Sequence, residues 1–458
     1  MKPLALRDIA DATEGALHWV SPNVTVRAVS TDSRRVHAGD LFVCLPGERV
    51  DGHEFAAAAV AAGAVAVLTS KLLPNALPQI VCRDTQWALG RIAARVAAER
   101  TTRVLAITGS NGKTSVKTLL KGILSRVASS YANPGNLNNE IGLPSSLLAQ
   151  PDDAVFGVYE MGAGKPGDIA YLCDVVTPQV ALVNNIAAAH LERMGSMLGI
   201  AQTKGAIYRA LPMGGVAVIA ADEPFAPLFE EMASHARIVR FGVDCPGDVM
   251  ARQIHLGATS SRFLLVTHRG SAQIHLPLAG MHNVRNALAA AAMALPVDVA
   301  LTDIVAGLEQ ATAVDGRLQR HELNGDIVLI DDSYNANPGS LGAAIAVLAA
   351  QGANTCLVLG DMRELGPDAL ELHRDMGRQA KEAGIRELHA VGPLASAAVQ
   401  GFGPSAKCHP DQQALIDELR ARMQPGLRCL IKGSRGSRMD RVVTALLHDH
   451  GEDTAHVA

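Results

Sequence analysis

A short glycine-rich loop constrains the fold of this chain more than any other feature. Residues 106–115 read "AITGSNGKTS" and end in Gly-Lys-Thr, as a phosphate-binding loop does. The full spacing G-x-x-x-x-G-K-[ST] would require glycine at position 107, where the chain has Ile107. An apolar run from Val104 precedes the loop, and "SVKTLLKGILSRV", with apolar residues at helical spacing, follows it. This order of strand, loop and helix predicts an anion site, because backbone N–H groups and the positive end of the helix dipole converge there.

The same loop supplies candidate nucleotide-binding residues. Lys113 can reach the outer phosphates of a nucleotide, and the Thr114 hydroxyl can ligate the Mg²⁺ that accompanies them. The alternative is a glycine-rich turn with a surface lysine, which the position of the loop between a strand and a helix disfavours. We expect the nucleotide to contact Gly109, Asn111, Gly112, Lys113, Thr114 and Ser115.

Length and pattern predict an α/β protein of three domains. A chain of 458 residues is too long for one compact core and suits roughly three domains of about 100 to 200 residues. After the loop, "AVFGVYEM", "QVALVNNI" and "GGVAVIAA" alternate with helical segments, which is typical of a doubly wound parallel sheet. A third set of strands begins after "DGRLQRHEL". We expect domains over residues 1–100, 101–314 and 315–458.

Composition excludes several classes of protein. With 48% hydrophobic residues, 19% charged residues and a net charge of -4, the chain lacks the basic stripe of a nucleic-acid binder. Its seven cysteines include no Cys-x-x-Cys pair, which favours a reducing compartment. The first residues lack the apolar core of a signal peptide, and the longest apolar run, from Phe55, is too short to span a bilayer. We therefore expect a cytoplasmic protein without a membrane segment.

Candidate metal ligands lie where later strands end. Glu160 closes "AVFGVYE", and His190 lies beyond "VALVNNI", at the sheet edge where ligands gather. A carboxylate suits Mg²⁺ well, whereas a histidine suits it less, so a buried, hydrogen-bonded histidine remains the alternative for His190. Lys204 reads by itself as a solvated helix residue, because an ammonium cannot bind a metal.

Two further polar clusters flank the end of the central domain. In "AGMHNVRNALAAAAMA", the residues His282, Asn283 and Asn286 begin an alanine-rich helix, where asparagines either bond a purine edge or cap the helix. The segments "DGRLQRHEL" and "VLIDDSYNANPGS" form the second cluster, for which a structural turn is the alternative to a binding loop. Its candidate residues are Arg317, Asp332, Tyr334, Asn335 and Asn337.

These motifs together resemble one family. "TGSNGKTS", Glu160, "AHLE" with Lys204 downstream, "GMHNVRNALAA", "DGR" and "DDSYNANP" are similar, in this order over essentially the whole chain, to the ATP-dependent Mur ligases. The resemblance implies a small N-terminal α/β domain for the UDP end of a sugar-peptide and a central P-loop-type ATPase domain. It also implies a C-terminal Rossmann-like domain that brings the amino substrate.

Other segments narrow the resemblance within the family. "STDSRRVHAGDLFVCLPGERVDGHEF", "NPGNLNNEIGLP", "YNANP", "LGDMRELG" and "KGSRGSRM" are similar to members that join D-alanyl-D-alanine to UDP-N-acetylmuramoyl-tripeptide. In the implied reaction ATP phosphorylates the terminal carboxylate, and the dipeptide amine attacks the resulting acyl phosphate. The resemblance also implies a monomeric enzyme of peptidoglycan synthesis.

The family pattern assigns roles to individual residues. It places Thr114 and Glu160 on one Mg²⁺ and His190 on a second, and Lys204 matches a lysine that members carry as a carbamate, an oxygen ligand. One departure is visible, because Lys-Gly-Glu is expected and Ala206 stands in place of the glutamate. The implied catalytic residues are Lys113, His190, Lys204 and Asp332. Asn283 would contact adenine, and Arg317 with Asp332 the ribose and phosphates. The implied substrate-binding residues are Ser30, Asp32, Ser33, Arg34, His53, Asn136, Asn138, Asn139, Tyr334, Asn335 and Asn337.

Three other functions remain as alternatives. The ligase of the preceding step, which adds the third peptide residue, shares the ATP chemistry, but the Asp-Asn-Pro-Arg motif of its diaminopimelate-adding members is absent from the sequence. Folylpolyglutamate synthases lack the N-terminal domain that the first hundred residues form. A nucleotide-gated switch would hydrolyse ATP without depending on an amino substrate.

Overall fold

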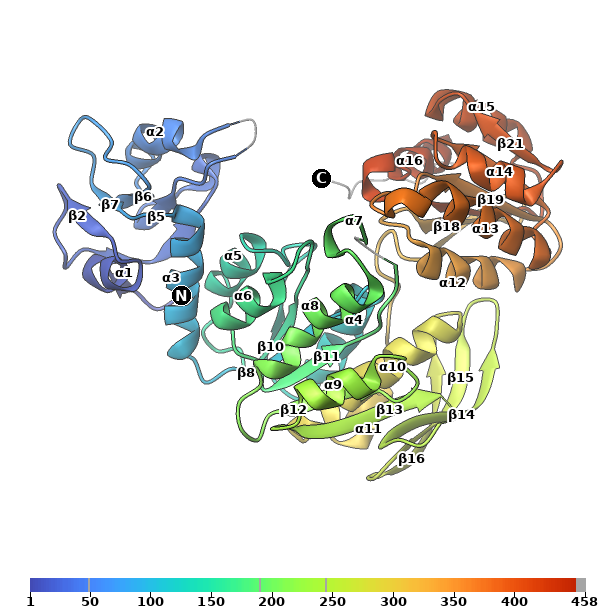
Figure 1. Ribbon diagram of the computed structural model, residues 1–458, viewed down its shortest axis with the longest axis horizontal. Coiled ribbons are helices and arrows are strands. Elements are labelled where there is room, and N and C mark those ends of the chain that lie inside the picture. The colour runs from blue at the N-terminus through green and yellow to red at the C-terminus, as the bar shows by residue number, and fades with distance from the viewer. Residues whose placement is uncertain (48–49, 189–190, 244, 450–458) are drawn as a thin grey trace.

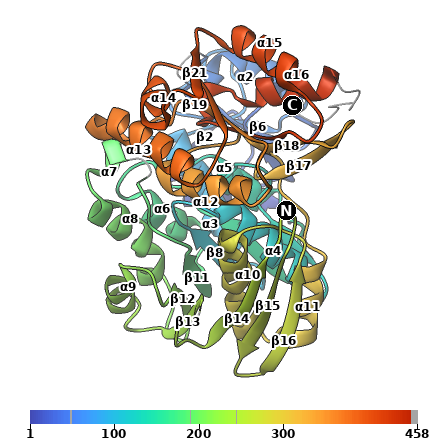
Figure 2. The ribbon, with the colours of Figure 1, turned by 90° about the vertical axis from the view of Figure 1, so that its right-hand side faces the viewer.

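The computed structural model describes residues 1–47, 50–188, 191–243 and 245–449. Three α/β domains follow one another along the chain, and each is built around its own main sheet. The N-terminal and C-terminal domains flank the central domain and lie toward the same side of it (Figures 1 and 2). Among the described residues, no helix combines the length and the apolarity that crossing a bilayer requires.

The N-terminal sheet has five strands in the order β2-β7-β6-β5-β4. Its four parallel strands are β4 (Ala28–Ser30), β5 (Asp40–Val43), β6 (Ala66–Thr69) and β7 (Gln79–Val81), and β2 (Ala16–His18) is antiparallel to β7. Strands β5 and β6 are buried throughout, as expected for short, continuous apolar runs. The remaining elements are β1 (Leu4–Ala5), β3 (Thr25–Val26), α1 (Leu6–Ala12) and α2 (Ala56–Ala61).

Helix α3 (Thr85–Ala98) joins the first two domains. Asp84 caps its first turn by accepting hydrogen bonds from the backbone N–H groups of Gln86 and Trp87. The helix packs against α5 (Gly142–Leu148) and α6 (Asp168–Val175) of the central domain. At Gly90 a Cβ atom would lie 2.3 Å from the Tyr171 hydroxyl, so only glycine permits this close approach. The two domains therefore share one continuous hydrophobic core.

The central sheet has nine strands in the order β16-β15-β14-β13-β12-β11-β8-β10-β9. Seven strands are parallel: β8 (Arg103–Thr108), β9 (Ser130–Ala132), β10 (Phe156–Glu160), β11 (Val180–Val183), β12 (Val216–Ala220), β13 (Arg237–Val243) and β14 (Val249–Leu256). Strands β15 (Ser261–Thr267) and β16 (Gly270–Leu276) extend it as antiparallel hairpins. The parallel part confirms the doubly wound sheet, whereas the antiparallel edge was not part of the expectation.

Helices cover both faces of this sheet. On one face lie α4 (Lys113–Leu124), α10 (Met281–Ala294) and α11 (Leu301–Glu309). On the other lie α5, α6, α8 (Met197–Arg209) and α9 (Ala226–Met232), and α7 (Leu191–Met194) precedes α8. Helix α10 is buried almost all round from Asn283 onward, because its small alanine side chains let the sheet and α4 approach closely.

The C-terminal sheet has six strands in the order β17-β18-β22-β19-β20-β21. Strands β18 (Ile327–Asp332), β19 (Thr355–Gly360), β20 (Glu387–Val391), β21 (Ala406–His409) and β22 (Arg428–Lys432) are parallel, and β17 (Gln319–Leu323) is an antiparallel edge. One face carries α12 (Pro338–Ala349), α13 (Ala369–Glu382) and α14 (Ser396–Phe402), and the other carries α15 (Gln412–Arg422) and α16 (Asp440–Asp449). This confirms the Rossmann-like expectation.

Candidate active site

The glycine-rich loop between β8 and α4 adopts a conformation that its glycines make possible. Gly109 has φ 144°, and Gly112, which precedes the first residue of α4, has φ 77°. A Cβ atom at Gly112 would lie 2.5 Å from both Asn184 Nδ2 and Asn286 Oδ1, so these side chains close around the loop. The Lys113 ammonium donates to the Gly109 carbonyl over 2.9 Å, and burial lowers its pKa. A loop with one glycine fewer than the full motif therefore still presents its N–H groups and a lysine at a helix N-terminus.

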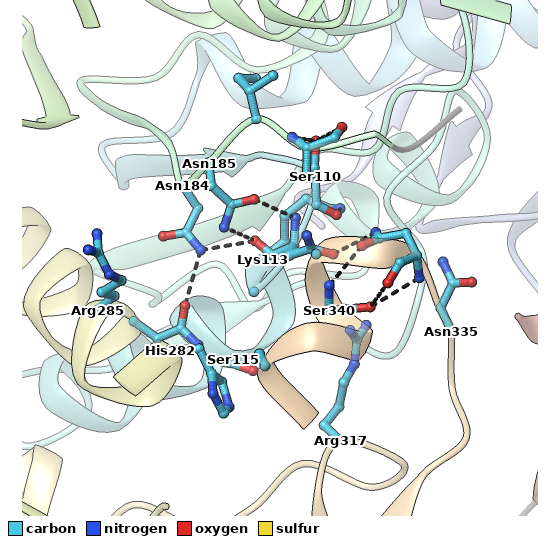
Figure 3. A pocket seen from close by; sticks show the side chains of 18 of the residues that line it. Ser110, Lys113, Ser115, Asn184, Asn185, His282, Arg285, Arg317, Asn335 and Ser340 are labelled. Carbon is cyan, nitrogen blue, oxygen red and sulfur yellow. Dashed lines mark hydrogen bonds between the residues drawn. The ribbon is translucent and has the colours of Figure 1, made fainter. Parts of the chain in front are cut away.

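A cavity of about 570 Å³ opens in front of this loop, between the central and C-terminal domains. Figure 3 shows the loop residues between two walls, one from α10 and one from the C-terminal domain. The predicted site residues that line the cavity are Asn111, Gly112, Lys113, Ser115, Asn138, Asn139, Glu160, Asn283, Arg317, Asp332, Tyr334, Asn335 and Asn337. Segments more than two hundred residues apart in sequence thus converge on one site.

Glu160 lies buried at the end of β10 and contacts both α4 and a neighbouring loop. Its Oε2 accepts a hydrogen bond from the Thr114 hydroxyl over 2.9 Å and lies 3.3 Å from Lys117 Nζ. Its Oε1 accepts from Asn138 Nδ2 over 2.8 Å. Burial alone would raise the pKa of Glu160, but the charges of Lys113 and Lys117 and these hydrogen bonds outweigh it and hold the pKa below its usual range. Glu160 is therefore an ionised carboxylate beside the phosphate-binding loop.

Two hydrogen bonds join the C-terminal domain to the loop. Asn337 Nδ2 donates to Asn111 Oδ1 over 2.7 Å, and Arg317 Nη2 donates to Thr114 Oγ1 over 3.3 Å. The Arg317 guanidinium also lies over the Tyr334 ring, 4.2 Å from its centre. These contacts bring an arginine next to the position where the loop would hold phosphates.

Asp332 forms a buried ion pair in the wall of the cavity. Its Oδ2 lies 2.5 Å from Lys432 Nζ, which also donates to the Asn335 carbonyl over 2.9 Å. Its Oδ1 accepts from the backbone N–H of Leu318 over 3.2 Å. If either side chain moved away or were removed, the charge of the other would remain buried without compensation. Asp332 and Lys432 therefore hold each other in place.

The asparagines of α10 do not cap the helix. Gly280 precedes its first residue, and no side chain supplies a capping hydrogen bond there. Asn283 Nδ2 instead donates to the Ala279 carbonyl over 2.9 Å, while Asn286 Oδ1 accepts from Asn184 over 3.1 Å. Burial, with Lys432 nearby, lowers the pKa of the neighbouring His282 to about 4, so the His282 imidazole is uncharged at physiological pH.

The structure contradicts the interpretation of Lys204, on α8, as a solvated residue. The residue is only 1% exposed, and Asp168 is the carboxylate whose charge acts on it. Burial, together with the positive charge of Lys113, lowers the pKa of its ammonium to about 7. The other expected metal ligand, His190, lies outside the described residues.

The candidate residues of the N-terminal domain do not line the cavity. Ser30 ends β4, and Asp32, two residues later, accepts two hydrogen bonds from the exposed Arg34 guanidinium and one from its backbone N–H. His53 is buried, accepts from the backbone N–H of Ser70 and lies 2.5 Å from Asp51. Ser30, Asp32, Ser33 and Arg34 thus lie at the carboxyl end of β4, and His53 lies near the carboxyl end of β6 through its bond from Ser70. Asn136 is exposed and also lies outside the cavity lining.

Sequence reasoning missed several polar residues of the site. Asn184 and Asn185 directly follow β11, and both donate to the Asn111 carbonyl. Lys432 ends β22, so its place at the carboxyl end of a buried strand was a usable signal. Arg285 and Asp222, an ion pair at 2.5 Å, also line the cavity, but nothing in the sequence connects them.

Three family models match consecutive parts of the chain. The model "Mur ligase family, catalytic domain" matches residues 25–96, "Mur ligase middle domain" residues 107–294, and "Mur ligase, glutamate ligase domain" residues 316–435. Together they cover the N-terminal domain, the domain of the glycine-rich loop and the C-terminal domain.

Individual proteins match over nearly the full length. The "UDP-N-acetylmuramoyl-tripeptide--D-alanyl-D-alanine ligase" of Escherichia coli (strain K12) is 41% identical over 449 residues, which is 97% of this chain and 99% of that protein. A crystal structure of MurF from Acinetobacter baumannii superposes with a TM-score of 0.93 at 38% identity, covering 98% of this chain and 99% of that one. MurF ligase from Thermotoga maritima in complex with ADP gives a TM-score of 0.85 at 27% identity, with 93% and 98% covered. By sequence, by fold and by the loop at its centre, the chain belongs to the Mur ligase family.

Proposed function

We propose that this protein is an ATP-dependent ligase that joins D-alanyl-D-alanine to UDP-N-acetylmuramoyl-tripeptide, a step of peptidoglycan synthesis. The observation that carries the proposal is the cavity in which the glycine-rich loop, the Glu160 carboxylate and the C-terminal Arg317 meet. The names of the full-length relatives agree with it. The tripeptide carboxylate becomes an acyl phosphate at the expense of ATP, because a free carboxylate is a poor electrophile, and the dipeptide amine then displaces phosphate.

The chain's own cations handle the charge of this reaction. Lys113, at the N-terminus of α4, reaches the outer phosphates of ATP, and Arg317 approaches the same place from the C-terminal domain. Negative charge spreads over the transferred phosphoryl group in the transition state, so fixed cations aimed at it lower the barrier. Because Arg317 comes from the other domain, closure of the two domains completes the site and excludes water from the acyl phosphate.

The residues present fit a Mg²⁺ ion. The Thr114 hydroxyl and the Glu160 carboxylate place hard oxygen ligands 2.9 Å apart beside the loop. In the described parts of the chain, no group of three acidic, histidine or cysteine side chains could hold a metal alone. Mg²⁺ favours a site in which few protein ligands are complemented by the phosphates of a nucleotide. When bound, the ion neutralises phosphate charge and orients the transferred group.

We assign Lys204 to a carbamate that, with His190, serves a second Mg²⁺. Two observations support a modified lysine, namely its nearly complete burial and the nearby charge of Lys113, which together outweigh the opposing charge of Asp168 and lower the pKa of the ammonium. An amine whose pKa is lowered to about 7 is about half uncharged at neutral pH, and the uncharged form is the one that reacts with carbon dioxide. The product is an anion with two oxygen atoms, near enough to Lys113 to feel its charge.

We assign the remaining substrate contacts by domain. The polar group of Ser30, Asp32, Ser33, Arg34 and His53 would hold the UDP end, and Asn136, Asn138 and Asn139 the peptide-bearing sugar. In the C-terminal domain Tyr334, Asn335 and Asn337 would contact the reacting ends. Asn283 would contact adenine, and Asp332 would orient the nucleotide through its pairing with Lys432.

We also propose domain bounds of 1–100, 101–314 and 315–458 and a cytoplasmic monomer. Six of the cysteines, in the described part of the chain, are free thiols, as expected in a reducing compartment, namely Cys44, Cys82, Cys173, Cys356, Cys408 and Cys429.

Product analysis distinguishes this proposal from the neighbouring reaction. The protein is incubated with ATP, Mg²⁺ and each of two pairs, UDP-N-acetylmuramoyl-tripeptide with D-alanyl-D-alanine, or the corresponding dipeptide with diaminopimelate or lysine. Mass spectrometry should find the pentapeptide product in the first mixture only. A tripeptide product in the second mixture would assign the protein to the preceding step.

A further inference from the structure

Lys117 is a buried lysine that the proposed chemistry does not use. It lies one helical turn after Lys113 on α4 and is 5% exposed. Its ammonium lies 2.8 Å from the Asn133 carbonyl, 3.1 Å from the Gly135 carbonyl and 3.3 Å from Glu160 Oε2. An ammonium has three N–H donors, so these oxygens occupy all of them.

The stability of helix α4 alone does not require a charge at position 117. A buried ion pair contributes little net stability, and apolar side chains of similar volume in place of both of its members are often as stable. Lys121, one turn further along the same helix, is exposed and makes none of these contacts. The ammonium of Lys117 therefore indicates that the groups it contacts have to be held in fixed positions.

The groups that Lys117 contacts belong to the loop 133–139 and to Glu160. Asn133 is buried, and its side chain accepts from the Glu160 N–H and donates to the carbonyls of Glu160 and Leu137. At the other end of the loop Asn138 donates to the Glu160 carboxylate. Between these anchors the backbone turns through Gly135 at φ 50° and is exposed, so Lys117 supplies the bond at its middle.

We infer that Lys117 is a positioning residue that ties the loop 133–139 to the phosphate-binding helix and so presents Asn138 and Asn139 to the cavity. The inference deepens the proposed function and rests on it in one respect, that this loop contacts the sugar-peptide. Lys117 makes no hydrogen bond to Lys113 or to the glycine-rich loop, and its one link to the nucleotide side of the site is the Glu160 carboxylate, which also accepts a hydrogen bond from Thr114.

The test compares Lys117→Met with Lys121→Met, a control on the same helix. In Lys117→Met the KM for the sugar-peptide should rise roughly tenfold or more, the size expected for losing hydrogen bonds from a charged donor. The KM for ATP should rise less, because Glu160 keeps its hydrogen bond from Thr114. Lys117→Arg keeps the charge and should recover part of the loss. Hydrogen exchange at the amides of residues 133–139 should be faster in Lys117→Met alone, whether or not substrate is present.

Three results would overturn the inference. These are equal rises of both KM values, unchanged amide exchange in residues 133–139, and a Lys117→Arg variant that folds but recovers none of the loss. Failure of the proposed function itself would appear differently, since the wild-type protein would then not use the sugar-peptide, while the exchange experiment would still report on the loop.

Discussion

Asn337 Nδ2 donates a 2.7 Å hydrogen bond to Asn111 Oδ1, which links the first turn of α12 to the glycine-rich loop across the domain boundary. The same side chain caps α12, because its Oδ1 accepts from the backbone N–H of Ser340 over 2.9 Å while the Ser340 hydroxyl bonds the Asn337 N–H. One residue thus begins a helix of the C-terminal domain and contacts the nucleotide-binding loop of the central domain.

Substitutions at Asn337 should separate these two roles. Serine caps helices well but is too short to reach Asn111, so Asn337→Ser should keep wild-type stability and raise the KM for ATP roughly fivefold, the value of one neutral hydrogen bond. Asn337→Ala should additionally lose about 1 kcal/mol of stability, as measured by urea unfolding. In the Asn111→Ala background, Asn337→Ser should have no further effect on the KM, and an additive effect would show that the bond does not operate.

Lys204 should be replaceable in part by a small carboxylate. Lys204→Ala removes the proposed carbamate and should be nearly inactive, whereas acetate or formate can occupy the vacated space and restore some activity. Lys204→Arg should stay inactive, because a guanidinium keeps its positive charge and cannot ligate a metal. An active arginine variant, or an alanine variant that no carboxylate rescues, would show that the lysine is unmodified.

A histidine pair in the C-terminal domain should make stability depend on pH. His389 Nδ1 lies 2.9 Å from His409 Nε2, and both rings are buried beside charged residues of neighbouring elements, namely Glu387, Lys407, Glu418 and Arg422. Burial lowers the pKa of His389 to about 4, with Arg422 and His409 adding to the effect, against about 6.5 in an unfolded chain.

The unfolded state therefore binds more protons between pH 4 and 6.5, so the stability of the fold falls as the pH falls through this window. His389→Gln should show a smaller drop in melting temperature between pH 7 and pH 4.5 than the wild type. His268→Gln, at an exposed histidine, is the matched control. Equal drops in all three proteins would assign the acid sensitivity to other groups.

Sequence patterns predicted the structural features that depend on residues close to one another in the sequence. The apolar strand, the glycine turn and the amphipathic helix around Gly112 are set by local conformation, so the loop and its lysine followed from ten residues. The antiparallel strands β15 and β16 did not, because β15 alternates between buried and exposed residues, which fits several sheet positions.

Contacts between distant segments could not be predicted in this way. Asn184 and Asn286 close around Gly112 from the end of β11 and from α10, and no periodicity relates them to the loop. Lys204 was interpreted as a solvated helix residue, and the burial of Lys117 was not predicted at all, because helical spacing shows which face is apolar but not whether another loop or helix covers the polar face. For Lys204 only the family resemblance suggested a different role.

The requirement for three substrates tests the central claim most directly. Phosphate release is measured with ATP and Mg²⁺ alone, with UDP-N-acetylmuramoyl-tripeptide or D-alanyl-D-alanine added singly, and with both, and Lys113→Ala serves as the control for the loop. Multiple-turnover release should appear only with both substrates present and should fall at least about a hundredfold in the control, as expected when one charge-stabilising group is lost. Full-rate ATP hydrolysis without the sugar-peptide would contradict the account and identify a nucleotide switch instead of a ligase.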